Sequence, residues 1–220
     1  KDGSTRWSYD AVVPILTLRG TAAPVIAGSL VYAGFATGMV VAIGAENGQP
    51  IWEQRVMLPQ GRSELDRIVD VDSTPLVSRN VVFAVSFQGR LKALRSSVGA
   101  PIWEREASSF LDLTEGYGQI YVVSEDGVIQ AVEKTDSSLI WEQTALRNRD
   151  LSSPLAFGNY VLVGDAQGYL HVLAQSDGRF IARKKINRKG VRSSMTVADN
   201  TVYLLGNGGR LSALEIRRKE

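Results

Sequence analysis

The chain is built from a repeat that centres on its four tryptophans. Similar runs end at each indole: DGSTRW at Trp7, NGQPIW at Trp52, VGAPIW at Trp103 and DSSLIW at Trp141, while DGRFIA puts Ala182 in the tryptophan place. A second repeated run, called here the glycine column, reads Gly-x-apolar-x-Ala-apolar. It starts at glycines spaced 51, 38, 41 and 41 residues apart: Gly38, Gly89, Gly127, Gly168 and Gly209. In three copies the alanine of this column precedes the next tryptophan by ten residues, so one unit recurs about every 40 residues.

Each unit contains four short segments with the pattern of β-strands. A small-Pro-apolar segment comes first, as at Pro24, Pro75 and Pro154, and a Val/Tyr-rich run, the glycine column and the Trp-Glu segment follow. Short turns rich in Gly, Asn, Asp and Ser separate the segments. Four antiparallel strands repeated at this period predict the blades of a β-propeller.

The predicted fold class is therefore all-β, a single propeller domain over residues 1–220. The repeats are expected at 1–9 (last strand only), 22–57, 73–106, 108–144, 152–186 and 193–217. A blade buries both of its faces only between neighbours. The small residues two places beyond the central apolar position of the glycine column would let sheets approach closely. The indoles of Trp7, Trp52, Trp103 and Trp141 would supply the contact between blades.

Composition excludes several kinds of site. The chain has no cysteine, which excludes disulfides, cysteine nucleophiles and zinc–thiolate sites. It has one histidine, which leaves little material for histidine-based catalysis or metal binding. The net charge of +2 gives no reason to expect a nucleic-acid partner. No apolar run has the length of a membrane-spanning helix. The chain opens on KDGSTRWSYD, without an initiator Met or a signal peptide, and is interpreted as a processed or truncated piece.

The run Ala-apolar-x-x-x-x-Gly-x-x-x-Trp, present as AIGAENGQPIW and ALRSSVGAPIW, resembles the tryptophan-docking motif of propellers related to pyrroloquinoline-quinone (PQQ) enzymes. LTLRGTAAPV (16–25) and GRSELDRIVDVDSTPLV (61–77) resemble the BamB family, and GDAQGYLHVL and DGRFIA look like its late blades. The resemblance implies about five blades of an eight-bladed propeller. It also implies a lipid anchor outside this chain, no cofactor, and a place on the periplasmic face of a Gram-negative outer membrane.

The five-blade count leaves an alternative open. The strand at residues 3–9 could complete the last repeat, at 193–217, and close a five-bladed ring. We favour an arc of a larger propeller, because the resemblance covers the C-terminal part of an eight-bladed family.

Two connections between repeats are longer than the others. From the tryptophan position to the next Pro (Met195 in the last copy) they span 17 and 23 residues after Trp7 and Trp52, against 13 after Trp141 and Ala182. Function usually lies on loops that a rigid scaffold holds. The resemblance implies that these two loops bind a periplasmic POTRA domain of BamA through Leu16, Leu18, Arg19, Asp70 and Asp72. In the opposing interpretation, the apolar loop tucks under the propeller and the charged loop is a solvated, partly helical excursion.

The implied function is a non-catalytic scaffold that helps outer-membrane β-barrel proteins fold and insert, with unfolded strands of those proteins as further partners. The alternatives are a PQQ-dependent dehydrogenase and a propeller that binds another protein. His171 occupies a variable position, and Asp126 and Asp165 read as turn residues, so we expect no catalytic or metal site. The basic run from Arg183 to Lys189 reads as a solvated strand edge.

Overall fold

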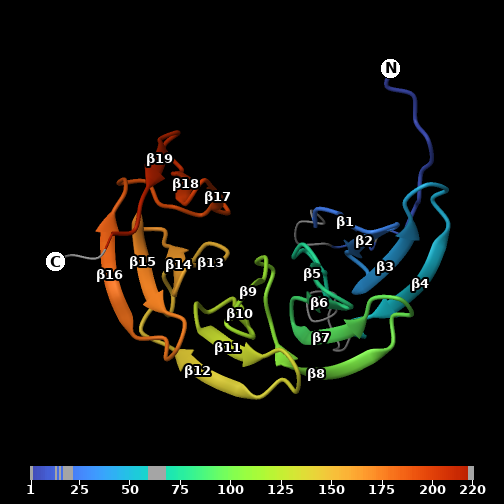
Figure 1. Cartoon of the computed structure of the whole chain (residues 1–220), viewed down its shortest axis with the longest axis horizontal. Helices are drawn as coiled ribbons and strands as arrows, with labels where there is room; N and C mark the ends of the chain where they lie inside the picture. Colours follow the sequence, from blue (N-terminus) through green and yellow to red (C-terminus); the bar gives the residue numbers. More distant parts are fainter. Residues whose placement is uncertain (1, 13, 15, 17–21, 59–67, 218–220) are drawn as a thin grey trace. The chain divides into compact units, whose positions relative to one another are not determined.

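The computed structural model describes residues 2–12, 14, 16, 22–58 and 68–217, and these fall into two compact units, residues 1–110 and 111–220. Each unit is described separately (Figure 1). Within the described ranges all regular structure is β-strand, and no helix there could cross a membrane.

The first unit holds two antiparallel sheets of four strands, each in simple chain order. One sheet consists of β1 (Val25–Ala27), β2 (Leu30–Phe35), β3 (Met39–Gly44) and β4 (Pro50–Arg55). The other consists of β5 (Leu76–Ser78), β6 (Val81–Val85), β7 (Gly89–Arg95) and β8 (Pro101–Ala107). Their facing sides share one core, with Tyr32, Val40 and Trp52 from one sheet against Val82, Ala84 and Leu94 from the other.

The second unit holds three sheets of the same kind. The first two have four strands each: β9 (Thr114–Gly116), β10 (Gln119–Val123), β11 (Ile129–Glu133) and β12 (Leu139–Gln143), then β13 (Leu155–Phe157), β14 (Tyr160–Gly164), β15 (Tyr169–Ala174) and β16 (Phe180–Lys185). The last has three: β17 (Thr196–Ala198), β18 (Thr201–Leu205) and β19 (Leu211–Leu214). One core lies between the first pair of sheets and another between the second pair.

The prediction of an all-β fold built from four-stranded antiparallel sheets is confirmed. Residues 2–10 form no strand, so the last strand expected at 1–9 does not form in the described part of that range. Trp7 contacts the first sheet instead.

The ten-residue spacing has a simple geometric cause. In the strand registers Ala42 lies opposite Trp52, Ala93 opposite Trp103 and Ala131 opposite Trp141. A bulge follows each pair, where the register shifts before the turn. These three alanines are fully buried, so a small side chain stands beside each indole where a sheet packs closely.

Three indoles dock on the following repeat in the same way. The Nε1 atoms of Trp7, Trp52 and Trp141 donate hydrogen bonds to the carbonyl oxygens of Ala45 (2.9 Å), Ser96 (2.8 Å) and Gln175 (2.7 Å). Each acceptor stands three residues before the glycine of the next turn, which is Gly48, Gly99 or Gly178. The indole lies directly on that glycine: a Cβ built on Gly99 would come within 2.6 Å of Trp52 Cδ2. Trp103 contacts Phe83 of its own sheet, with the ring centroids 5.7 Å apart.

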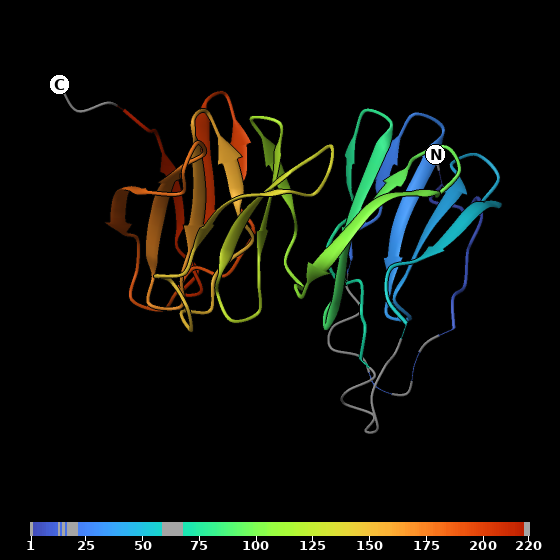
Figure 2. The ribbon, with the colours of Figure 1, turned by 90° about the horizontal axis from the view of Figure 1, so that it is seen from below.

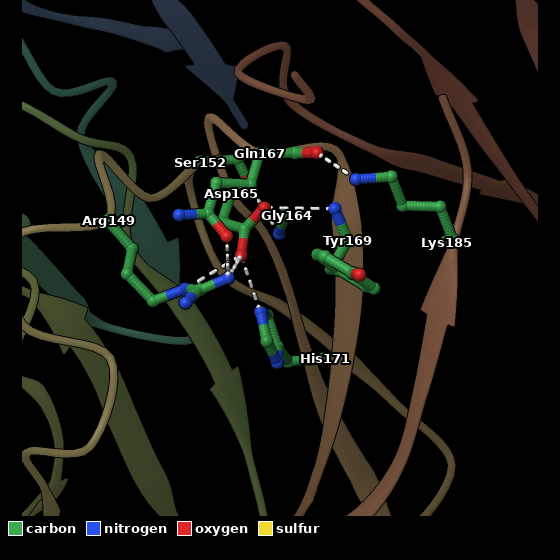
Figure 3. Close-up of polar contacts among 8 residues, drawn as sticks. All are labelled: Arg149, Ser152, Gly164, Asp165, Gln167, Tyr169, His171 and Lys185. Carbon is green, nitrogen blue, oxygen red and sulfur yellow. Dashed lines mark hydrogen bonds and ion pairs between the residues drawn. The ribbon is translucent and has the colours of Figure 1, made fainter. Parts of the chain in front are cut away.

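A buried polar network cross-links β14, β15 and the segment before β13 (Figure 3). The Asp165 carboxylate is fully buried and accepts hydrogen bonds from Arg149 (Nη2, 2.6 Å), the Tyr169 backbone N–H (2.9 Å) and His171 Nε2 (2.8 Å). Because a carboxylate only accepts, the neutral His171 ring carries its proton on Nε2. Burial would raise the pKa of Asp165, but the three donors outweigh it and lower that pKa.

The His171 side chain is 2% exposed, and its pKa is also lowered. Burial is the largest cause. The hydrogen bond and charge of Asp165 oppose it, and the charges of Arg149 and Arg183 add to it. Histidine in this fold therefore stays neutral at a pH where the unfolded chain would take up a proton.

Replacing Gly99 with alanine should destabilise the first unit more than replacing Gly28. Both glycines have positive φ, +70° and +61°, but nothing lies within 4 Å of a Cβ on Gly28. Gly28→Ala therefore reports the backbone cost alone, about 1–2 kcal/mol, and Gly99→Ala adds about 1–3 kcal/mol from overpacking against Trp52. Urea unfolding followed by tryptophan fluorescence measures both. Equal losses would show that the indole does not press on the turn.

The chain has one histidine, so the difference between the stability profiles of the wild type and a His171 variant from pH 7 to 5 reports on His171. The unfolded histidine takes up a proton below about pH 6.5, while the folded histidine resists protonation. The free energy of unfolding should therefore decrease as the pH is lowered, by up to about 1.4 kcal/mol per pH unit. His171→Gln removes this titration and should have a flatter profile over the same range. A wild-type protein that gains stability toward pH 5 would mean that folded His171 is charged.

Candidate partner-binding site

The two long connections that the sequence singled out both belong to the first unit. One precedes β1, and the other joins β4 to β5. Figure 2 shows the described ends of the second connection, after β4 and before β5, at the same end of the unit.

The described end of the second connection, Ile68–Ser73, is buried between the two sheets. The Val71 N–H donates to the Phe35 carbonyl (3.2 Å), and the Asp70 carbonyl accepts from the Phe87 N–H (2.9 Å). Ser73 Oγ donates to the Val85 carbonyl (3.3 Å). The segment thus adds a backbone bridge between a turn of one sheet and a turn of the next, and the solvated interpretation is wrong for these residues.

The connection from β16 to β17 follows the same path without the two aspartates. There Val191 N–H donates to the Asp165 carbonyl (2.8 Å), Gly190 accepts from the Asn207 N–H (2.9 Å), and Ser193 Oγ donates to the Leu205 carbonyl (3.0 Å). Aligned on the valines, Gly190 stands for Asp70 and Arg192 for Asp72. The backbone path therefore does not require carboxylates at these positions.

Asp70 and Asp72 are nevertheless deeply buried, with exposed fractions of 0% and 6%. Strand-like alternation turns them to one side and Val69 and Val71 to the other. A buried carboxylate is stable only when a cation or several donors compensate it. Two such groups beside each other are suited to hold an arginine in a fixed position, while neither offers a surface of its own to a partner.

The apolar connection before β1 exposes side chains. Val12 is 82% and Leu16 44% exposed, so these two residues do not tuck under the sheets. Leu18 and Arg19 lie outside the described residues, as do Arg62, Glu64, Asp66 and Arg67 of the second connection. The structure thus locates three of the five predicted binding residues, Leu16, Asp70 and Asp72.

The weaker candidates have structural roles. His171 is held by Asp165 in the buried network, and the Asp126 carboxylate accepts from Ser124 in the turn between β10 and β11. The basic run begins on the exposed strand β16. No group of three potential metal ligands occurs in the described part of the chain.

Sequence reasoning missed the network around Asp165. Its members come from the end of β14, from β15 and from the preceding connection, and only the structure brings them together. A signal was present in DGRFIAR, where the repeat loses both its tryptophan and the glutamate that follows it.

Comparison with known proteins gives consistent matches. The family model described as outer membrane protein assembly factor BamB matches residues 1–143 and 125–218. The BamB of Pseudomonas aeruginosa is 48% identical over 94% of this chain and 55% of its own length, and that of Escherichia coli is 35% identical over 92% and 52%. The chain thus spans about half the length of the curated relatives it matches.

Solved structures agree on the fold. The crystal structure of BamB from Moraxella catarrhalis has a TM-score of 0.91 and 31% identity, covering 97% of this chain and 64% of that one. A quinohemoprotein alcohol dehydrogenase from Pseudomonas putida, 14% identical with a TM-score of 0.67 over 97% of this chain and 44% of that one, shares the fold alone. The sheets are therefore propeller blades, and because the family model matches both halves of the chain, the chain belongs to the BamB family.

Proposed function

We propose that this chain is part of a non-catalytic scaffold of the outer-membrane β-barrel assembly machinery, at the periplasmic face of the outer membrane. It binds the POTRA region of BamA and assists the folding and insertion of β-barrel proteins. The names of its relatives support the assembly role. In this proposal the two units form one arc of a larger propeller.

The observation that carries the proposed binding site is the pair of buried aspartates that the backbone path does not need. Equivalent positions beside Val191 hold Gly190 and Arg192, so the backbone path does not require carboxylates, and burying two of them costs free energy that a cation or hydrogen-bond donors must offset. We infer that the pair fixes the Arg19 guanidinium, while Leu16 and Leu18 supply the apolar anchors. An arginine flanked by apolar side chains on a rigid support is a typical interface hot spot.

This assignment divides the five residues into two roles. Leu16, Leu18 and Arg19 contact BamA, and Asp70 and Asp72 act through Arg19. The exposed Leu16 and the fully buried Asp70 match these roles. No observation on this chain favours quinone chemistry, since the likeness to a dehydrogenase extends to the fold alone.

The triple change of Leu16, Leu18 and Arg19 to alanine should weaken binding to a BamA POTRA fragment at least thirtyfold. Hot-spot residues contribute about 2 kcal/mol or more, which is about thirtyfold in Kd. Val12→Ala is the matched control, because Val12 is an exposed apolar residue of the same segment, and it should change Kd by less than about twofold. Binding is measured by calorimetry with the full chain.

The supporting role of the aspartates has its own test. Asp70→Asn keeps the shape but removes the charge, and should weaken BamA binding about tenfold through the loss of a charge-assisted hydrogen bond. Circular dichroism and the urea midpoint verify that the variant is folded. In the Arg19→Ala background the same change should have no further effect on binding. Unchanged binding by the folded triple variant would remove the site assignment.

A further inference from the structure

Strand β16 departs from the charge pattern of the other outer strands. In β4, β8 and β12 a glutamate follows the tryptophan: Glu53, Glu104 and Glu142. Each has a partner, since Tyr9 Oη donates to Glu53 (2.7 Å), Gln130 Nε2 donates to Glu142 (2.7 Å), and Lys92 pairs with Glu104 (2.9 Å). In β16 the two residues are Ala182 and Arg183, so the strand has a cation where the others have a carboxylate.

The first unit shows what the glutamate does. A groove of about 330 Å³ lies where the chain leaves β4, beside β7 and β8, and is lined by Gln54–Leu58, Arg90, Lys92 and Glu104. The Glu104 carboxylate pairs with both Arg90 and Lys92. Glu104 therefore gives two of the three cations in this groove an ion-pair partner, while the third, Arg55, donates to the Thr37 carbonyl (3.3 Å).

The matching place in the second unit is a pocket of about 390 Å³ between the end of β12 and strands β15 and β16. It is lined by Ala145, Leu146, Arg149, His171 and Phe180–Arg183. The strand registers of the two sheets correspond. Lys92 lies opposite Glu104 on β7 and β8, and His171 lies opposite Arg183 on β15 and β16, so Arg183 occupies the position of Glu104. No acidic side chain is in this lining.

Two cations at the pocket, Arg183 in its lining and Lys185 beside it, have no ion-pair partner within the described residues. Arg149 is paired with the buried Asp165 (2.6 Å). Arg183 stacks on the Tyr169 ring, with its Cζ 4.8 Å from the centroid, and makes no ion pair within the described residues. Lys185 contacts the same ring, at 4.1 Å. The groove of the first unit thus contains a carboxylate between its cations, and the pocket of the second unit has the cation without the carboxylate.

The pocket also has apolar walls and an open strand edge. Phe180 is 43% and Ile181 44% exposed, and buried Leu146 lies beneath them. Strand β16 is the last in its sheet, and all six of its residues are exposed. None of the described strands pairs with its outer edge. An extended polypeptide could form backbone hydrogen bonds there.

We propose that this pocket is a docking site for an extended polypeptide that pairs with the edge of β16 and places an acidic side chain against Arg183. The acid takes the place that Glu104 fills in the first unit. Cross-strand neighbours share a face, so the residue two places along the bound segment lies over Phe180 and Ile181, and an apolar side chain fits there. The preferred segment therefore has an acidic and an apolar residue separated by one position.

The other outer edges select against such a segment. A glutamate on the incoming strand would face Glu53, Glu104 or Glu142 on β4, β8 or β12, and like charges across a strand pair are destabilising. On β16 the same side chain meets Arg183. This inference goes beyond the proposed function and does not depend on BamA binding.

The test uses the full chain and a short synthetic peptide with blocked ends, in which one isoleucine and one glutamate, two residues apart, stand among threonines. Fluorescence anisotropy measures its Kd. Arg183→Gln should weaken binding about tenfold, the typical effect of losing one charge-assisted contact. Lys184→Gln removes the same charge from the opposite face of the same strand, and should change Kd by less than twofold.

A peptide with glutamine in place of glutamate should bind the wild-type chain about tenfold more weakly, and should bind the Arg183→Gln variant no worse than the glutamate peptide does. Hydrogen exchange of residues 180–185 should slow when the glutamate peptide binds. Equal losses from Arg183→Gln and Lys184→Gln would reduce the effect to general electrostatic attraction and overturn the proposal. So would unchanged exchange, no measurable binding, or equally tight binding of 3-phenylpropionate, a small acid without a peptide backbone.

Discussion

The contact between an indole and the glycine of the next turn is the interaction on which each unit depends. A four-stranded sheet of this size cannot bury both faces by itself, and the tryptophan at its outer strand bridges to its neighbour. The ring lies on the glycine while Nε1–H donates to a carbonyl three residues earlier. This demands positive φ and no side chain at one position, and a small residue opposite the indole. The glycine of the turn, the alanine opposite the indole and the tryptophan itself therefore recur together in the sequence.

Most of the fold could be predicted from the sequence because its determinants are local. The Ala42–Trp52 spacing is a cross-strand pair and a turn, both close along the chain. Gly99 and Gly178 stand in the corresponding turns of their own repeats, and this turn type gives both of them a positive φ. Burial of Asp70 could not be predicted in this way. It results from a backbone bridge between Phe35 and Phe87, and an Asp-x-Asp run in a long connection looks like a solvated loop until both sheets are in place.

The candidate site was predictable only as far as a family resemblance reached. It pointed to the Leu-x-Leu-Arg and Asp-x-Asp runs, but not to the different roles of their members. Leu16 is exposed and Asp70 fully buried, a difference that depends on the packing of the connection and not on residue type. The Asp165 network is hidden for a related reason. His171 and Asp165 face each other across a hairpin turn, while Arg149 comes from the previous connection.

The two departures from the repeat follow one physical rule. Where a repeat satisfies its own charges, as Glu104 does for Arg90 and Lys92, the surface offers little to another molecule. At Asp70 and Asp72 the same path has carboxylates that the backbone does not need. At Arg183 it has lost the carboxylate that its sister strands have, and there a charge is left for something beyond the repeat. A repeated scaffold makes such sites visible, because every other copy shows what folding alone requires. Arg183 is the sharper case, since three sister strands have the glutamate that it replaces.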